Sequence, residues 1–229
     1  MKSLESEILE AREQEQPPRT MKELENRIFQ AGEQWRAEHT ETKINESTGD
    51  VTEKVAMPQV FTVAKMLSEI ITFTFISKSN VPDYSLLYIY DLDEGIYTAS
   101  NDLFNRFCKT FDVRIKPREW PQIKLMVRTL TRIKKPLESA YLIPVQNGII
   151  DLKTKELLPF SPKYVITSKI STAYHAPKRV PTDREGKTFD DWLNSIACND
   201  SELVTLFWQI ILEAINPNHT RNKFAIFYG

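Results

Sequence analysis

The chain has 229 residues, 41% of them hydrophobic, which is enough for one large or two small folded cores. Its formal net charge of −1 excludes a chain that is basic throughout, but this total conceals two oppositely charged regions. Residues 1–50 carry twelve acidic and seven basic side chains, whereas residues 114–135 carry eight basic side chains and one acid.

The N-terminal segment, residues 1–57, is predicted to be a polar and acidic region that is loosely attached to the folded body. Apolar residues at helical spacing predict helices over residues 4–11 and 21–35, with two adjacent prolines between them. Residues 38–54 are polar and have the composition of a linker or frayed loop. Two interpretations of the segment stay open: it is partly disordered, or it binds a partner protein.

The second segment, residues 58–142, is predicted to be an α+β unit. Residues 60–74 are expected to begin as a helix. Aromatic-rich residues 86–90 and residues 96–98 are expected to form a β-hairpin around an acidic turn. Ser100 then has the position of an N-cap for a helix that follows at once.

A basic helix is expected from Trp120 to Ile133. Its cations recur at every fourth position and line one flank, while two lysines complete its C-terminal end. We identify these cations as candidate DNA-binding residues: Lys124, Arg128, Arg132, Lys134 and Lys135. Two interpretations stay open, because such a stripe either follows a phosphate backbone or complements the helix dipole on a solvated face.

The third segment, residues 143–182, is predicted to be β-rich. Residues 149–152 and 156–158 flank a short polar turn, which favours a second hairpin. The pair Asn147-Gly148 lies between apolar strand formers, so one of the two residues is expected to have a positive φ at a turn or bulge.

The fourth segment, residues 183–229, is predicted to be helical. Its apolar side chains are expected to form packed helix faces, and they are Leu193, Ile196, Leu203, Leu206, Phe207, Ile210, Ile211 and Ile215. Pro217 is expected to end the long helix. Residues 224–228 then have the pattern of a short strand that runs into Gly229. The fold class is therefore α+β, with a small, hairpin-rich mixed sheet covered by helices and followed by a helical segment.

Catalytic and metal-binding patterns are not found in the sequence. The three histidines are isolated, and the acids Asp91, Asp93 and Glu94 lack the spacing of a calcium loop. Asp151 and the pair Asp190-Asp191 are interpreted as turn and helix-start residues. We therefore predict no catalytic residue and no metal site.

Targeting and disulfide signals are also not found. Cys108 and Cys198 have no nearby cysteine partner, so we expect reduced thiols and an intracellular protein. The first 30 residues lack the apolar core of a signal peptide. The most apolar run, residues 70–76, is far shorter than a membrane span of roughly 20 residues.

An ordered set of motifs begins at residue 143. It comprises Asn-Gly, two apolar residues and Asp-Leu; a polar turn and a run that ends in Ser-Pro; an aromatic-x-x-Pro exit; Phe189-x-x-Trp192-Leu193; a long apolar helix; and the final strand. This order resembles the N-terminal accessory, or collar-type, domain of phage, plasmid and poxvirus primase–helicases, whose motor belongs to helicase superfamily 3. The resemblance is clear over residues 143–229, weaker over residues 86–135 and absent before Val60.

The resemblance implies that Gly229 is the first glycine of a nucleotide-binding loop, G-x-x-x-x-G-K-[ST], and that the chain stops before the ATPase domain. The intact protein would use ATP and magnesium to unwind DNA as a ring in the cytoplasm of a bacterial host. The present stretch would bind single-stranded or forked DNA, help the ring to self-associate and contact other replication proteins, without binding or hydrolysing ATP.

Two other functions stay open. The chain could be a protein-interaction module that recruits a primase, initiator or loader without binding DNA, through its acidic N-terminus and its tyrosine-rich hairpin. It could also be a nucleotidyl-transferring primase, which the absence of a carboxylate cluster disfavours.

Overall fold

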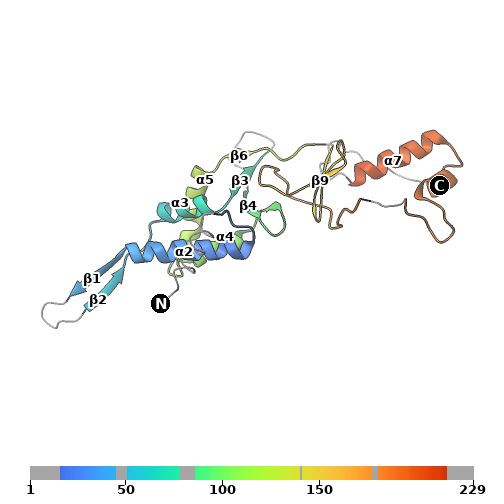
Figure 1. Cartoon of the computed structure of the whole chain (residues 1–229). Coiled ribbons are helices and arrows are strands. Elements are labelled where there is room, and N and C mark those ends of the chain that lie inside the picture. Colours follow the sequence, from blue (N-terminus) through green and yellow to red (C-terminus); the bar gives the residue numbers. More distant parts are fainter. Residues whose placement is uncertain (1–15, 45–50, 78–85, 140, 177–179, 216–229) are drawn as a thin grey trace. The chain divides into compact units, whose positions relative to one another are not determined.

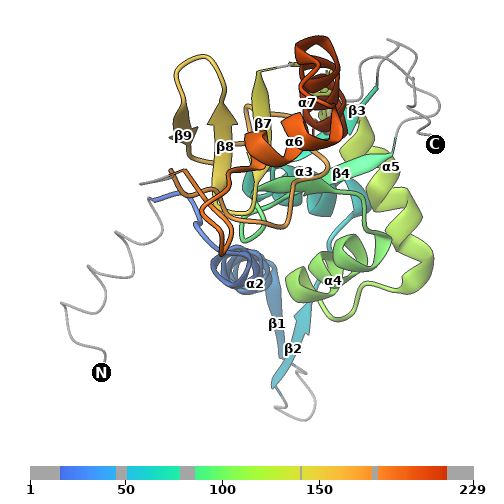
Figure 2. The same cartoon turned by 90° about the vertical axis from the view of Figure 1, so that its right-hand side faces the viewer.

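The computed structural model describes residues 16–44, 51–77, 86–139, 141–176 and 180–215 (Figures 1 and 2). The chain divides into two compact units, Met1–Pro136 and Leu137–Gly229. The whole is an α+β protein, as the sequence predicts, with small sheets and covering helices.

A four-stranded mixed sheet in the order β5-β4-β3-β6 forms the centre of the first unit. β3 (Phe73–Ile76) pairs antiparallel with β4 (Leu87–Asp91), and β4 turns back into β5 (Ile96–Thr98). β6 (Ile133–Lys134) adds in parallel to the other side of β3. The hairpin β4–β5 confirms the prediction, whereas β3 and β6 were not predicted as strands.

Four helices supply the apolar side chains that cover one face of this sheet. They are α2 (Met21–Glu38), α3 (Val60–Ile70), α4 (Asn101–Phe111) and α5 (Trp120–Leu130), with the short 3-10 turn η2 (Pro117–Glu119) before α5. Alternate residues of β3 and β4 face the helices, and this buried set is Phe73, Phe75, Leu87 and Ile89. The Ser100 side chain accepts a hydrogen bond from the Leu103 N–H, which confirms the predicted cap of α4.

The expected loose attachment of the N-terminal segment is wrong for α2. Four of its apolar side chains are buried in the core of the first unit: Met21, Leu24, Ile28 and Trp35. Gly32 brings the α2 backbone against Phe111 at the end of α4. The abundance of charge on the outer face of α2 conceals this amphipathic core face in the composition. The helix predicted over residues 4–11 lies outside the described residues.

The predicted linker over residues 38–54 contains a hairpin instead. β1 (Thr40–Ile44) pairs antiparallel with β2 (Val51–Val55), and the hairpin continues from the end of α2 (Figure 1). The Ala56 N–H donates to the His39 carbonyl at the base of the hairpin, 3.1 Å away. Threonine, valine and isoleucine favour extended backbone, and this preference outweighs the polar composition that predicted a loop.

The second unit contains a three-stranded antiparallel meander, visible in Figure 2. Its strands are β7 (Leu142–Val145), β8 (Gly148–Asp151) and β9 (Glu156–Leu158). β8 and β9 are the predicted second hairpin. Asn147 anchors this meander to a later segment, because its side-chain amide donates to the Tyr174 carbonyl and accepts from the Tyr174 N–H, both at 2.9 Å.

Gly148 confirms the predicted positive φ. It begins β8 with a φ of +154°, directly after the two-residue connection from β7. A Cβ atom at this position would lie 2.6 Å from the carbonyl oxygen of Leu158 in β9. Two independent constraints therefore require glycine here, namely the backbone conformation and the close approach of the neighbouring strand.

Replacing Gly148 with valine is expected to destabilise the second unit by on the order of 1–3 kcal/mol, because a β-branched residue is strained at this φ and clashes with Leu158. Urea denaturation followed by circular dichroism measures the change. The matched control is Thr167→Val at an exposed position of the same unit, for which we expect a change within about 0.5 kcal/mol. Equal stability of the two variants would contradict the prediction.

Two helices, α6 (Phe189–Ile196) and α7 (Ser201–Ile215), complete the described part of the second unit. Thr188 and Asp191 form a capping box at the start of α6, which agrees with the helix-start role predicted for Asp191.

The expected packed faces of these two helices are only partly found. Leu193 is buried, but α7 has no buried residue, and four of the predicted core side chains are at least 43% exposed: Ile196, Leu203, Leu206 and Ile215. These side chains are therefore only partly covered within the described residues. Pro217 and the predicted strand over residues 224–228 lie outside that part of the chain.

Candidate nucleic-acid interface

The predicted basic helix is shorter than expected, and three of the five candidate cations lie beyond it. α5 ends at Leu130, and Thr131 has an extended conformation with φ −105° and ψ 139°. Only Lys124 and Arg128 are helical. β6 pairing with β3 replaces the last predicted helical turn, because strand hydrogen bonds satisfy the backbone that the helix would otherwise pair.

This change divides the predicted stripe between two faces of the sheet. The Arg128 guanidinium carbon lies 5.5 Å from the centroid of the Phe75 ring, which belongs to the helix-covered face. Lys134 is one residue further along β6 than Ile133, the partner of Phe75, and therefore points to the opposite face. There its Nζ lies 3.3 Å from the Tyr97 hydroxyl. The single helical flank that we predicted is therefore wrong.

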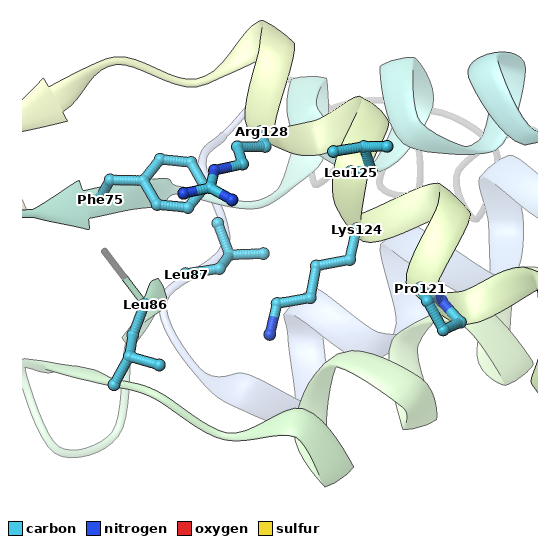
Figure 3. Close-up of a pocket in the computed structure, with 7 residues that line it drawn as sticks. All are labelled: Phe75, Leu86, Leu87, Pro121, Lys124, Leu125 and Arg128. Atoms are coloured by element: carbon cyan, nitrogen blue, oxygen red, sulfur yellow. The ribbon is translucent and has the colours of Figure 1, made fainter. Parts of the chain in front are cut away.

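Lys124 and Arg128 stand beside an open pocket of about 230 Å³ between α5 and the sheet (Figure 3). Five apolar residues complete its lining: Phe75, Leu86, Leu87, Pro121 and Leu125. Figure 3 shows the Arg128 guanidinium across the Phe75 ring and the Lys124 side chain extending from α5 beside Leu87. The pocket thus combines two cations with an apolar wall, and none of the described residues that line it is acidic.

The electrostatics of this pocket favour an anion. Burial lowers the pKa of the Lys124 ammonium, and the positive charge of Arg128 lowers it further. The Lys124 Nζ donates to the Asn101 side-chain oxygen at 2.7 Å, so its nearest polar partner at the start of α4 is neutral. An anionic group between the two cations would relieve their repulsion.

On the opposite face of the sheet, Lys134 lies beside a buried tyrosine pair. The rings of Tyr90 and Tyr97 are 5.1 Å apart in an edge-to-face arrangement, and both residues are at most 5% exposed. Burial, followed by the proximity of Tyr90, raises the pKa of Tyr97 to about 12. Burial therefore favours the neutral form of the Tyr97 hydroxyl.

The remaining basic residues of residues 114–135 have different roles. Arg114 is structural, because it pairs with Asp112 and donates to the carbonyls of Val55 and Ala56 at 3.0 and 3.1 Å. Arg132 and Lys135 are exposed near the parallel strand β6.

Our sequence interpretation missed the apolar residues that line the pocket beside Lys124 and Arg128. The available signal was Leu125, an apolar residue directly after Lys124 that lies outside the predicted apolar face of the helix.

The acidic turn between β4 and β5 organises the backbone. Asp91 accepts hydrogen bonds from the N–H groups of Asp93 and Glu94, and Asp93 accepts one from Met21 at the start of α2. Within the described ranges, no group of three or more His, Cys, Asp or Glu side chains is arranged to hold a metal ion. Asp151 likewise accepts the N–H of Lys153 in the turn after β8, as predicted.

Three further sequence predictions concern Cys108, Gly229 and membrane-spanning segments. Cys108 is buried in the core of the first unit, and burial raises the pKa of its thiol to about 12. Gly229, the candidate nucleotide-binding residue, lies outside the described residues. Among the helices that the structure describes, none has both the length and the apolar character needed to cross a membrane.

Comparison with known proteins agrees with the motifs found in the sequence. The family model described as "D5 N terminal like" matches residues 19–198. The match begins at α2, so the expectation that the resemblance is absent before Val60 is wrong. No curated protein matches the chain. Since the family model covers most of the sequence, the chain belongs to the D5 N-terminal-like family, the N-terminal region of D5-type primase–helicases.

Proposed function

We propose that this chain is the non-motor, N-terminal region of a phage or plasmid replicative DNA helicase, and that it aids ring assembly and DNA engagement. The match of residues 19–198 to the D5 N-terminal-like family carries this proposal. In the intact protein a superfamily 3 motor would follow this region and use ATP and magnesium to unwind DNA in the cytoplasm of a bacterial host. The stretch itself would neither bind nor hydrolyse ATP.

The basic residues of α5 and β6 support a role in DNA engagement. Lysine and arginine hold single-stranded DNA mainly through its phosphates, without preference for sequence. Lys124 and Arg128 are held by a helix whose apolar residues Ile123 and Val127 are buried in the core. Such a rigid support lowers the conformational entropy that the two cations lose on binding.

We predict that Lys124→Ala, Arg128→Ala and Arg132→Ala together weaken the binding of single-stranded DNA. The salt dependence of the affinity should also fall, by about one unit of slope for each lost phosphate contact. Fluorescence anisotropy with a labelled oligonucleotide at several salt concentrations measures both quantities.

A matched control removes three exposed lysines of the same unit, one each on α2, β2 and α3: Lys22, Lys54 and Lys65. Both triple variants have the same net charge, so the control separates a local contact from a general loss of positive charge. The variant that lacks Lys124, Arg128 and Arg132 could bind single-stranded DNA with the same affinity as the parent at low salt. That result would show that these three residues are only a solvated surface.

A protein-interaction module stays as a second candidate. The structure does not leave α2 and the tyrosines of the β4–β5 hairpin, which suggested this function, as free surfaces. α2 is packed into the core, and Tyr90 and Tyr97 are buried. The observation that favours it now is the exposed apolar surface of α6 and α7, where Trp192 is 53% and Leu212 is 51% exposed.

If the parent binds DNA in a salt-dependent manner and both triple variants retain this binding, the DNA contacts lie elsewhere in the chain. A parent protein that binds no single-stranded or forked DNA at low salt would favour the interaction module.

A further inference from the structure

The pocket between α5 and the sheet has a composition that phosphate binding alone does not require. Two of its apolar side chains are more than half exposed, with Leu86 at 58% and Leu125 at 54%. They stand on opposite sides of the pocket, Leu86 just before β4 and Leu125 on α5 (Figure 3). A ligand that contacts only phosphate-binding cations would leave this apolar surface in water.

The Arg128 guanidinium adds a flat surface to the pocket. It lies over the Phe75 ring with 5.5 Å between the guanidinium carbon and the ring centroid, and Phe75 itself is only 3% exposed. Nucleobases stack on arginine planes as well as on aromatic rings. Leu86, Leu87 and Leu125 also line the pocket, so they supply the apolar surface for the rest of a planar ring system.

The two cations define where an attached anion would lie. Lys124 and Arg128 are one helical turn apart on α5 and line the same pocket, which no acidic side chain from the described part of the chain lines. Burial and, to a smaller extent, the charge of Arg128 lower the pKa of the Lys124 ammonium. A phosphate beside the pocket would therefore interact favourably with both charges.

We propose that this pocket holds one nucleobase of single-stranded DNA, while Lys124 and Arg128 together bind the phosphate beside that base. The inference rests on the proposed DNA binding and assigns a base-binding subsite to it. A planar apolar group joined to phosphate matches both halves of the pocket. An acidic amphipathic peptide is the competing occupant, and the planar guanidinium of Arg128 over the Phe75 ring favours the nucleobase over it.

The test compares two oligonucleotides with the same number of phosphates, a 12-residue oligothymidylate and a fully abasic strand of equal length. We expect the parent chain to bind oligothymidylate about tenfold more tightly, the effect typical of one stacked base. Leu125→Ser should remove most of this preference and leave the affinity for the abasic strand unchanged. Leu86→Ser should act in the same direction.

The matched control is Val113→Ser, which changes a 75% exposed valine outside the pocket lining and should preserve the preference. Circular dichroism verifies that each serine variant is folded. Equal binding of both strands by the parent, or a preference that survives both leucine substitutions, overturns the base subsite but leaves the proposed DNA binding intact.

Failure of both strands to bind at low salt would instead overturn the proposed DNA binding, and the subsite with it. In that case a glutamate- and leucine-rich amphipathic peptide is titrated against the parent and the Leu125→Ser variant. Peptide binding that the variant loses would assign the pocket to a protein partner.

Discussion

Replacing Gly32 with alanine is expected to destabilise the first unit by about 3 kcal/mol or more. A Cβ atom at this position would lie 1.9 Å from the carbonyl oxygen of Phe111 and 2.8 Å from its carbonyl carbon. Both are backbone atoms at the end of α4, so no side chain can rotate away to make room. The helices α2 and α4 would have to separate, and the packing of Ile28 and Phe107 between them would loosen.

The sign of this effect makes the experiment decisive, because alanine in an isolated helix is about 1 kcal/mol more favourable than glycine. Urea denaturation followed by the fluorescence of Trp35 on α2 measures the change, with the other three tryptophans replaced by phenylalanine. Gln30→Ala, at an exposed position of the same helix, is the control and should alter stability by less than about 0.5 kcal/mol. Stabilisation by Gly32→Ala would refute the close approach of the two helices.

Replacing Asp112 with alanine is expected to lower the free energy of unfolding of the first unit by about 3 kcal/mol. Asp112 is 1% exposed and follows α4 directly. Its carboxylate accepts from the Arg114 guanidinium at 2.7 Å, and the Arg36 guanidinium on α2 lies 3.7 Å away. The substitution would leave Arg114, which also holds the Val55 carbonyl of the hairpin, without its counter-charge. Breaking a buried ion pair typically lowers the free energy of unfolding by about 3–5 kcal/mol. We expect the lower end of this range because the Arg114 side chain is one-third exposed.

The contribution of Asp112 should depend on pH in a defined direction. Burial raises the pKa of its carboxyl, but hydrogen bonds from Arg114 and the charges of Arg114 and Arg36 outweigh burial, so the pKa is lowered overall. A lowered pKa in the folded state gives stability that is fully present above the unfolded value of about 3.9 and is lost as the pH falls through the folded value.

The difference in unfolding free energy between the parent and Asp112→Asn should therefore be constant near pH 7 and shrink below about pH 4. Urea denaturation at pH 7, 5 and 3 measures it. Glu69→Ala, at an exposed position on α3, is the control and should show a small difference at every pH. A difference for Asp112→Asn that grows on acidification would contradict the assigned pKa direction.

Local sequence signals predicted the elements whose partners are close in the chain. The hairpin β4–β5, the cap at Ser100 and the hairpin β8–β9 all depend on residues within about a dozen positions of one another. The positive φ of Gly148 belongs to the same group, because an Asn-Gly pair between apolar strands specifies a turn by itself.

Only part of the candidate interface could be predicted from the sequence, because the rest depends on residues that are far apart in the chain. The helical spacing of Lys124 and Arg128 correctly places both on α5. The spacing could not show that residues 133 and 134 would leave the helix to pair with β3, about 58 residues earlier in the chain. Since neighbouring strand residues point to opposite faces, that pairing separates Lys134 from the other two cations.

The amino-acid sequence by itself determined the α+β class, the turns and caps, and the membership of the D5 N-terminal-like family over residues 19–198. Only the tertiary structure decided that α2 is a core helix, that Gly32 is a contact point and that Asp112 is a buried ion-pair partner. The pocket beside Lys124 and Arg128 also arises only in the folded unit. The physical reason is that periodicity and propensity report contacts along the chain, whereas burial depends on residues that folding brings together from far apart.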